Sequence, residues 1–191
     1  MKKNLVIILL PALVVVLAVL GILSFKGSNN NPSNTTSNVT SLPSNSSDSD
    51  SNSEPLKMAS DFTLTDLNGK QVTLSELKGK NVFLNFFATW CAPCKKELPE
   101  IQKIEKEYKD KDLVVYLIDL GEDHDTVKNF MEKNNYTFNV LMDTNSDAGN
   151  LYRTTEIPTS LFINKEGKIV QRHAGIMTYE VVKEYVEKLY K

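Results

Sequence analysis

The feature that most constrains this chain is a pair of cysteines placed where a buried strand gives way to a helix. Residues Val82–Phe87 form an apolar run interrupted only by Asn85, which predicts a strand covered on both faces. The segment Cys91-Ala92-Pro93-Cys94 follows, and apolar residues then recur at helical spacing as far as Asp110. A thiolate at a helix start faces unpaired backbone N–H groups and the positive end of the helix dipole, both of which lower a thiol pKa. We therefore expect Cys91 to be the nucleophile and Cys94 to resolve the mixed disulfide.

Other uses of these two cysteines, which are all that the chain contains, fit less well. A purely structural disulfide across so short a loop would constrain the unfolded chain very little. A closed zinc site takes four ligands, and the further candidates of the usual kind are only His124 and His173. Haem attachment needs a histidine directly after the second cysteine, where this sequence has Lys95.

Alternating and periodic apolar patterns predict one folded domain over residues 56–191. Short strands at 62–64 and 72–74 flank Asn68-Gly69, a favoured turn, so the domain should open with a β-hairpin. The pattern then predicts strands at 113–118 and 140–142, helices opening near 123–125 and around 148–152, a hairpin of 161–164 with 169–174, and a last helix over about 178–190. Pro99 should kink the helix after Cys91. This order implies an α/β fold with a central mixed β-sheet flanked by helices.

The N-terminal part of the chain differs in composition from the domain. The uncharged run Leu5–Phe25 is long enough to cross the roughly 30 Å hydrocarbon core of a bilayer. Bulky residues stand where a signal peptidase site would need small ones, so residues 1–26 are predicted to be an uncleaved anchor, with a cleaved signal peptide as the alternative. Lys2 and Lys3 should stay cytoplasmic, which directs the rest of the chain outward. Residues 27–55, rich in Ser and Asn, should be a disordered linker.

Charge excludes one class of partner. The chain has 22 Lys and Arg against 24 Asp and Glu, and a nucleic-acid-binding protein needs a strong basic excess. We therefore expect no nucleic-acid partner.

The segment from Asn85 to Pro99, which reads Asn-Phe-Phe-Ala-Thr-Trp-Cys-Ala-Pro-Cys-Lys-Lys-Glu-Leu-Pro, resembles the active site of the TlpA/ResA-type thioredoxin-like proteins. The segment 156–163 is similar to the second signature of that family. The resemblance extends over essentially all of 56–191 and implies a thioredoxin-like fold, with an extra strand and helix inserted within 121–155. It also implies that Pro158 is cis and lies beside the cysteine pair, with Ile157 offering backbone groups to an extended substrate.

Three further residues take roles from the same resemblance. Ordinary thioredoxins carry a buried Asp where this chain has Asn85, so another acid must help to move protons. Glu97, one helical turn beyond Cys94, resembles the Glu that tunes the cysteine pKa values in this group, although beside two lysines it could also be solvated helix surface. Trp90 and Pro93 are expected to shape the substrate-binding surface, with core packing as the alternative for Trp90.

The predicted function is an extracytoplasmic thiol-disulfide oxidoreductase that needs no cofactor and no metal. By resemblance alone it is a reductase of protein disulfides, with apocytochrome c as a candidate substrate and a membrane electron carrier of the CcdA/DsbD type as donor. A thioredoxin-fold copper chaperone is one alternative, although it would space its cysteines by three residues and would here need His173 as a ligand. A peroxiredoxin is another, but Leu84 and Ala88 occupy the positions of the Pro and Thr in its Pro-x-x-x-Thr-x-x-Cys motif.

Overall fold

A computed structural model of the chain describes residues 56–191. The predicted anchor over 1–26 and the predicted linker over 27–55 lie outside the described residues. Among residues 56–191, no helix combines the length and the apolar character needed to cross a membrane.

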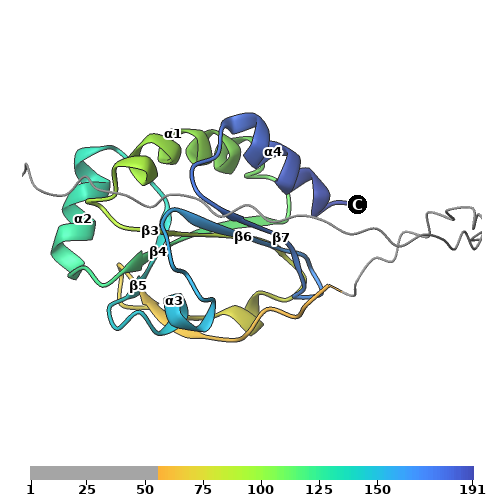
Figure 1. Ribbon diagram of the computed structural model, residues 1–191, viewed down its shortest axis with the longest axis horizontal. Helices are drawn as coiled ribbons and strands as arrows, with labels where there is room; N and C mark the ends of the chain where they lie inside the picture. Colours follow the sequence, from red (N-terminus) through yellow and green to blue (C-terminus); the bar gives the residue numbers. More distant parts are fainter. Residues whose placement is uncertain (1–55) are drawn as a thin grey trace, which may run out of the picture. The chain divides into compact units, whose positions relative to one another are not determined.

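A seven-stranded mixed sheet forms the centre of the domain (Figure 1). Its strands run in the spatial order β2-β1-β5-β4-β3-β6-β7. The bounds are β1 Thr63–Asp66, β2 Gln71–Thr73, β3 Asn81–Phe87, β4 Leu113–Leu120, β5 Asn139–Asp143, β6 Thr159–Ile163 and β7 Ile169–Ala174. Strand β3 is buried along its whole length because it pairs with β4 in parallel and with β6 in antiparallel orientation, while helices cover both faces.

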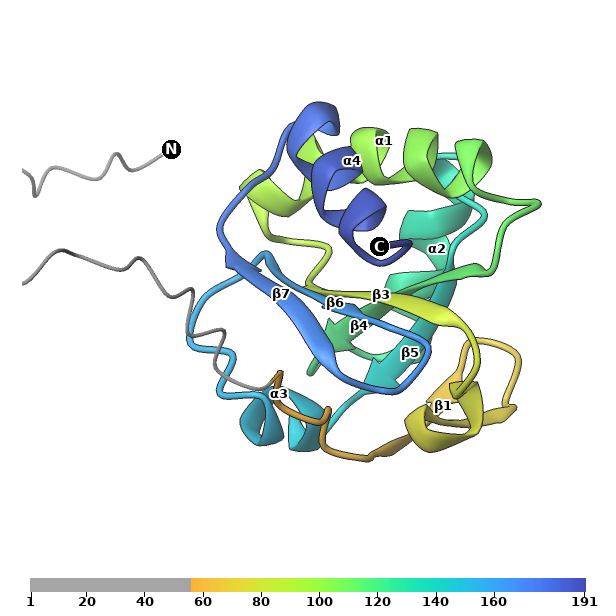
Figure 2. The ribbon, with the colours of Figure 1, turned by 90° about the vertical axis from the view of Figure 1, so that its right-hand side faces the viewer.

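Helices lie on both sides of the sheet, as the two ribbon views show (Figures 1 and 2). Helices α1 Ala92–Glu107, α2 His124–Lys133 and α4 Tyr179–Lys188 cover one face. The short helix α3 Asp147–Leu151 and the 3₁₀ helix η1 Leu74–Leu77 pack on the other face. The predicted mixed sheet with helices on both faces is therefore confirmed.

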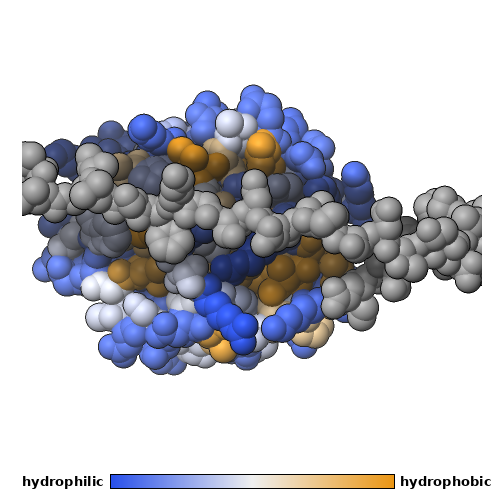
Figure 3. Space-filling model, viewed as in Figure 1, coloured by the Kyte–Doolittle hydropathy of each residue, from blue (hydrophilic) through white to orange (hydrophobic). Residues whose placement is uncertain are grey.

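The larger of the two cores lies between the sheet and the layer formed by α1, α2 and α4. Phe83 of β3 and Phe162 of β6 are fully buried there and stack with their ring centroids 4.5 Å apart. On the face of the domain seen in Figure 3, hydrophilic residues surround a few apolar patches. Cys91, which precedes α1, and Cys94, in its first turn, both belong to this core, so the redox pair is held by the core itself.

Most predicted elements occur where the sequence placed them, and the differences are at element ends. The opening hairpin is present, but Leu74 begins the 3₁₀ helix η1 instead of ending the second strand. Helix α1 ends at Glu107, a few residues before the predicted Asp110, and continues through Pro99. Segment 121–155 contains α2, β5 and α3, and β5 lies between β4 and β1 in the sheet.

The first described residues close part of the outer edge of the sheet. Met58 forms an isolated antiparallel bridge with Lys168, next to the start of β7. On either side of the bridge, the Ala59 N–H donates to the carbonyl of Gly167 and the Ile169 N–H donates to the carbonyl of Lys57, both at 2.9 Å. We call this pairing of residues 57–59 with 167–169 the entry clasp.

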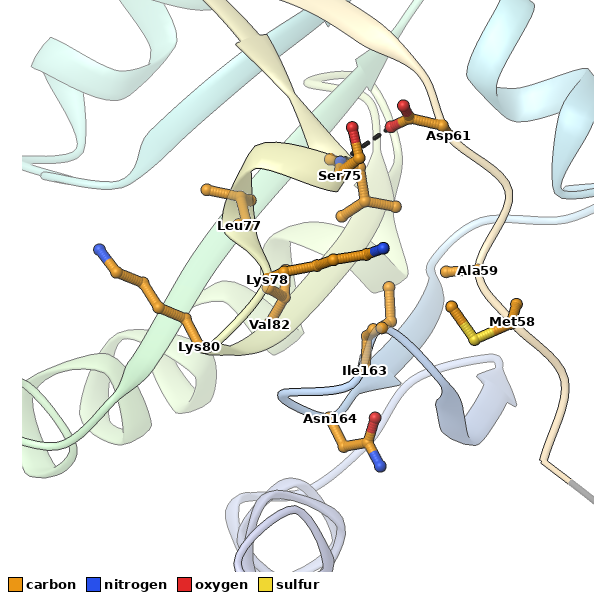
Figure 4. Close-up of a pocket in the computed structure, with 12 residues that line it drawn as sticks. Met58, Ala59, Asp61, Ser75, Leu77, Lys78, Lys80, Val82, Ile163 and Asn164 are labelled. Atoms are coloured by element: carbon orange, nitrogen blue, oxygen red, sulfur yellow. Dashed lines mark hydrogen bonds between the residues drawn. The ribbon is translucent and has the colours of Figure 1, made fainter.

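A cavity of about 160 Å³ lies at the end of the sheet where β3 begins (Figure 4). Val82 and Ile163 form its floor, and at its rim the Ser75 N–H donates to Asp61 at 2.8 Å. The cysteine pair follows the other end of β3, so this cavity is not part of the redox site.

Candidate active site

Strand β3 and helix α1 together position the cysteine pair. Cys91 is the N-cap of α1, and its Sγ accepts the backbone N–H of Cys94 at 3.2 Å. The two residues form a disulfide, and both are almost completely buried. After reduction, the same N–H group and the helix dipole would stabilise a thiolate on Cys91 in preference to Cys94, which lies further into the helix.

The loop before β6 lies against the first sulfur. The Ile157–Pro158 peptide bond is cis, as predicted. The carbonyl oxygen of Ile157 lies 3.7 Å from Cys91 Sγ and contacts the sulfur in the oxidised pair. Once the pair is reduced, the Cys91 thiol can donate a hydrogen bond to this carbonyl oxygen. Ile157 is half-buried and Pro158 buried, and the Pro158 carbonyl accepts the Gly175 N–H at 2.8 Å. The structure therefore places Ile157 beside Cys91, and its role in binding a substrate chain stays a prediction.

Glu97 is buried in the core and is not on the solvated surface of α1. Its Oε1 accepts the Met177 N–H at 3.1 Å, and its Oε2 accepts from Asn85 Nδ2 at 3.2 Å. Asn85 Nδ2 also donates to Ser160 Oγ at 2.9 Å. Burial raises the pKa of Glu97 to about 7, although these two donors oppose the shift. Glu97 can therefore gain or lose a proton near neutral pH, one helical turn from Cys94.

Two predicted substrate-binding residues lie at the surface beside the pair. Trp90 is 68% exposed, so core packing does not explain it. Pro93, between the two cysteines, is also exposed. A large exposed aromatic side chain next to a buried disulfide suits contact with another polypeptide, and this role stays a prediction for both residues.

The sequence reasoning missed the acids that hold the loop in front of Cys91. The Glu122 carboxylate accepts both the backbone N–H of Thr89 and, at 2.6 Å, the Thr89 hydroxyl. The fully buried Asp119 accepts the Glu122 N–H at 3.0 Å. One signal could have indicated them: both lie at or just after the carboxyl end of β4, which is parallel to β3, so they reach the sheet edge from which Cys91 also emerges.

The described residues offer little to a metal ion. Within 56–191, no group of three or more His, Cys, Asp or Glu side chains is arranged to hold one. His173 of β7 lies against Tyr185, with ring centroids 5.8 Å apart, and His124 bonds to the Leu67 carbonyl. Nothing in this arrangement favours the copper-chaperone alternative.

A cysteine pair at the start of a helix that follows the central strand, with a cis-proline loop against the first sulfur, defines a thioredoxin-like thiol-disulfide oxidoreductase. Comparison with known proteins then identifies the group: the profile of the AhpC/TSA family matches residues 55–172. The chain belongs to this family, as a ResA-type thiol-disulfide oxidoreductase.

Individual relatives agree with this assignment. The chain is 39% identical over 133 residues to the thiol-disulfide oxidoreductase ResA of Bacillus thuringiensis, covering 70% of this chain and 77% of the relative. It is 41% identical over 128 residues to ResA of Bacillus subtilis, covering 67% and 72%. Among solved structures, the pneumococcal exposed lipoprotein thioredoxin Etrx1 from Streptococcus pneumoniae superposes with a TM-score of 0.61 at 34% identity, covering 68% of this chain and all of that one. The thioredoxin-like fold and the enzyme class predicted from the sequence are thereby confirmed, and the peroxiredoxin alternative gains no support from these relatives.

Proposed function

We propose that this protein is a reductase of protein disulfides on the outer side of the bacterial cytoplasmic membrane. The Cys91 thiolate attacks a substrate disulfide, one substrate sulfur leaves and takes a proton, and a mixed disulfide with Cys91 remains. Cys94 then transfers its proton to Glu97 and attacks Cys91 Sγ. The second substrate thiol is released, and the Cys91–Cys94 disulfide forms.

The observation that carries the reductive direction is the burial of Glu97 one helical turn from Cys94. A carboxylate near a thiol disfavours the thiolate and so raises the thiol pKa. Strongly oxidising members of the fold owe their potential to a stabilised reduced form, and an acid at this position works against that stabilisation. The same acid, with its pKa near 7, can accept the Cys94 proton at the pH where the enzyme operates.

Location and partners complete the proposal. The uncharged run Leu5–Phe25 would anchor the chain, and residues 27–55 would tether the domain outside the cell. The likeness to an exposed lipoprotein thioredoxin supports an outside location. Because thioredoxin systems are cytosolic, a membrane thiol carrier of the CcdA/DsbD type would return the pair to the reduced state, and apocytochrome c is the proposed substrate.

The equilibrium reduction potential tests the direction. The purified full chain, equilibrated with dithiothreitol and read by thiol trapping, should have a potential near that of thioredoxin, about −270 mV. A value near that of the strongly oxidising proteins, about −120 mV, would overturn the reductase and make the protein a catalyst of disulfide formation.

Trapping tests the substrate. A Cys94→Ser variant cannot resolve the mixed disulfide, so it should accumulate covalent complexes that dithiothreitol releases, whereas Cys91→Ser should accumulate none. Recovery of apocytochrome c among the released proteins, with reduced cytochrome c levels after deletion of the gene, would support the proposed substrate. Wild-type cytochrome c levels in the deletion strain would rule it out.

A further inference from the structure

A fully buried carboxyl group, Asp119, lies near the end of β4 and has no part in the chemistry described above. Asp119 pairs with Phe87 of β3 in the sheet. Because side chains of a strand point alternately to its two faces, residues 115, 117 and 119 point to the same face, which α1 covers. Oδ1 accepts the backbone N–H of Glu122, but within residues 56–191 no donor reaches Oδ2. A buried carboxylate oxygen without a donor is costly, so this oxygen needs a proton or a partner.

Glu122 connects Asp119 to the active site. Its two carboxylate oxygens accept the backbone N–H and the hydroxyl of Thr89, the residue two places before Cys91. These bonds hold the segment that carries Trp90 and Cys91 to the end of β4. Glu122 is half-buried, and both of its carboxylate oxygens act as acceptors in these bonds.

The bond from the Glu122 N–H places the Asp119 carboxyl beside Glu122. Two carboxylates are both acceptors, so a hydrogen bond between these two side chains would require a proton, and the fully buried Asp119, whose Oδ2 has no donor, is the group to carry it. Burial, reinforced by Glu122 and by Asp143 at the end of β5, raises the pKa of Asp119 to about 8. The neighbouring strand β3 has no charged side chain that could lower the pKa of Asp119. The buried acid of α1, Glu97, bonds to Asn85 and Met177 instead of to Asp119.

We propose that Asp119 and Glu122 form a carboxyl pair that shares one proton and that, through Thr89, positions the Trp90–Cys91 segment. While Asp119 is protonated, it donates to Glu122, and Glu122 keeps Thr89 in place. When Asp119 ionises, two adjacent carboxylates repel each other, and the bonds from Glu122 to Thr89 weaken. Asp119 and Glu122 are thus positioning residues. This inference concerns the same cysteine pair as the proposed function but does not depend on the reductive direction.

Trp90 gives a direct measurement because it is the only tryptophan in the chain and follows Thr89. The oxidised full chain is titrated from about pH 5 to about pH 10 while its fluorescence is recorded, so that no free thiol contributes. Wild type should show a transition that is half complete at the pKa of Asp119 and about nine-tenths complete one pH unit above it. Asp119→Asn should lack this transition and keep the low-pH fluorescence throughout, because the Asn amide donates to Glu122 at every pH.

Two further variants separate this transition from other causes. Thr89→Val removes the hydroxyl that Glu122 binds and should shift the fluorescence at low pH toward the high-pH value of wild type. Glu97→Gln should leave the transition in place, which distinguishes it from ionisation of Glu97. The proposal is overturned if Asp119→Asn titrates like wild type, or if wild type shows no transition in this range. Neither of these fluorescence results depends on the reduction potential, so they test the Asp119–Glu122 proposal independently of the proposed reductase function.

Discussion

Replacement of Glu97 by Gln should change how the stability of this protein depends on pH. Burial moves the pKa of this carboxyl from 4.5, its ordinary value, to about 7 in the folded state. Between these two values the folded state binds a proton that the unfolded state has lost, so wild-type stability falls as pH rises from about 4.5 to about 7. At 1.36 kcal/mol per pH unit of separation, the loss is roughly 3 kcal/mol.

The Gln side chain should fit this site without a large rearrangement. Its carbonyl oxygen can still accept the Met177 N–H. The side-chain NH₂ group of the introduced Gln needs an acceptor where Glu97 now accepts from Asn85. Asn85 Oδ1 has no hydrogen-bond partner, so rotation of the Asn85 amide would supply this acceptor. The variant should therefore gain stability relative to wild type across this pH range, by up to roughly 3 kcal/mol.

Urea unfolding of wild type and Glu97→Gln at several pH values between about 4 and about 8 measures the difference. Glu100→Gln provides a matched control on the same helix, because Glu100 contacts Lys103 near the surface and accepts no buried donor. Its unfolding curve should follow that of wild type at every pH. If the free energy of unfolding changes with pH in the same way for wild type and Glu97→Gln, Glu97 is not a buried acid that takes up a proton on folding.

Three other substitutions test the packing and the surface. Phe83→Ala, which removes a fully buried ring stacked on Phe162, should lower the free energy of unfolding by about 3–5 kcal/mol in urea; a loss below about 1 kcal/mol would contradict the packing described. Trp90→Ala should change stability by no more than about 0.5 kcal/mol yet slow reduction of a disulfide-linked peptide, and unchanged rates would remove Trp90 from the substrate surface. Glu107→Gln breaks the surface ion pair with Lys183 and should cost at most about 1 kcal/mol, whereas a cost above about 2 kcal/mol would show a pair stronger than its exposure allows.

Sequence periodicity was sufficient to predict the elements that bury the most apolar surface. Strand β3 and helix α1 have unambiguous patterns, and the cysteine pair between them indicated the chemistry. The 3₁₀ helix η1 was missed because it spans only four residues, and its first residue, Leu74, fits a strand end as well as a short helical turn. Local pattern cannot distinguish such short elements.

The polar part of the site was less predictable because distant segments build it. Lys95, Lys96 and Glu97 together resemble a solvated helix face, and Glu97 is buried because Met177, 80 residues away, supplies a donor. The bond between Glu122 and Thr89 likewise joins segments 33 residues apart. The presence of Asn85 in place of an acid was the one local sign that another acid should be sought near the cysteine pair.

The entry clasp described above has a practical consequence for work with the isolated domain. Strand β7 lies at the edge of the sheet, and an open edge offers unpaired N–H and C=O groups to other chains. Residues 57–59 occupy the beginning of this edge. A truncated protein that starts at Ser60 would keep every catalytic group but lose this cover, and it should aggregate at concentrations where one that starts at Leu56 does not.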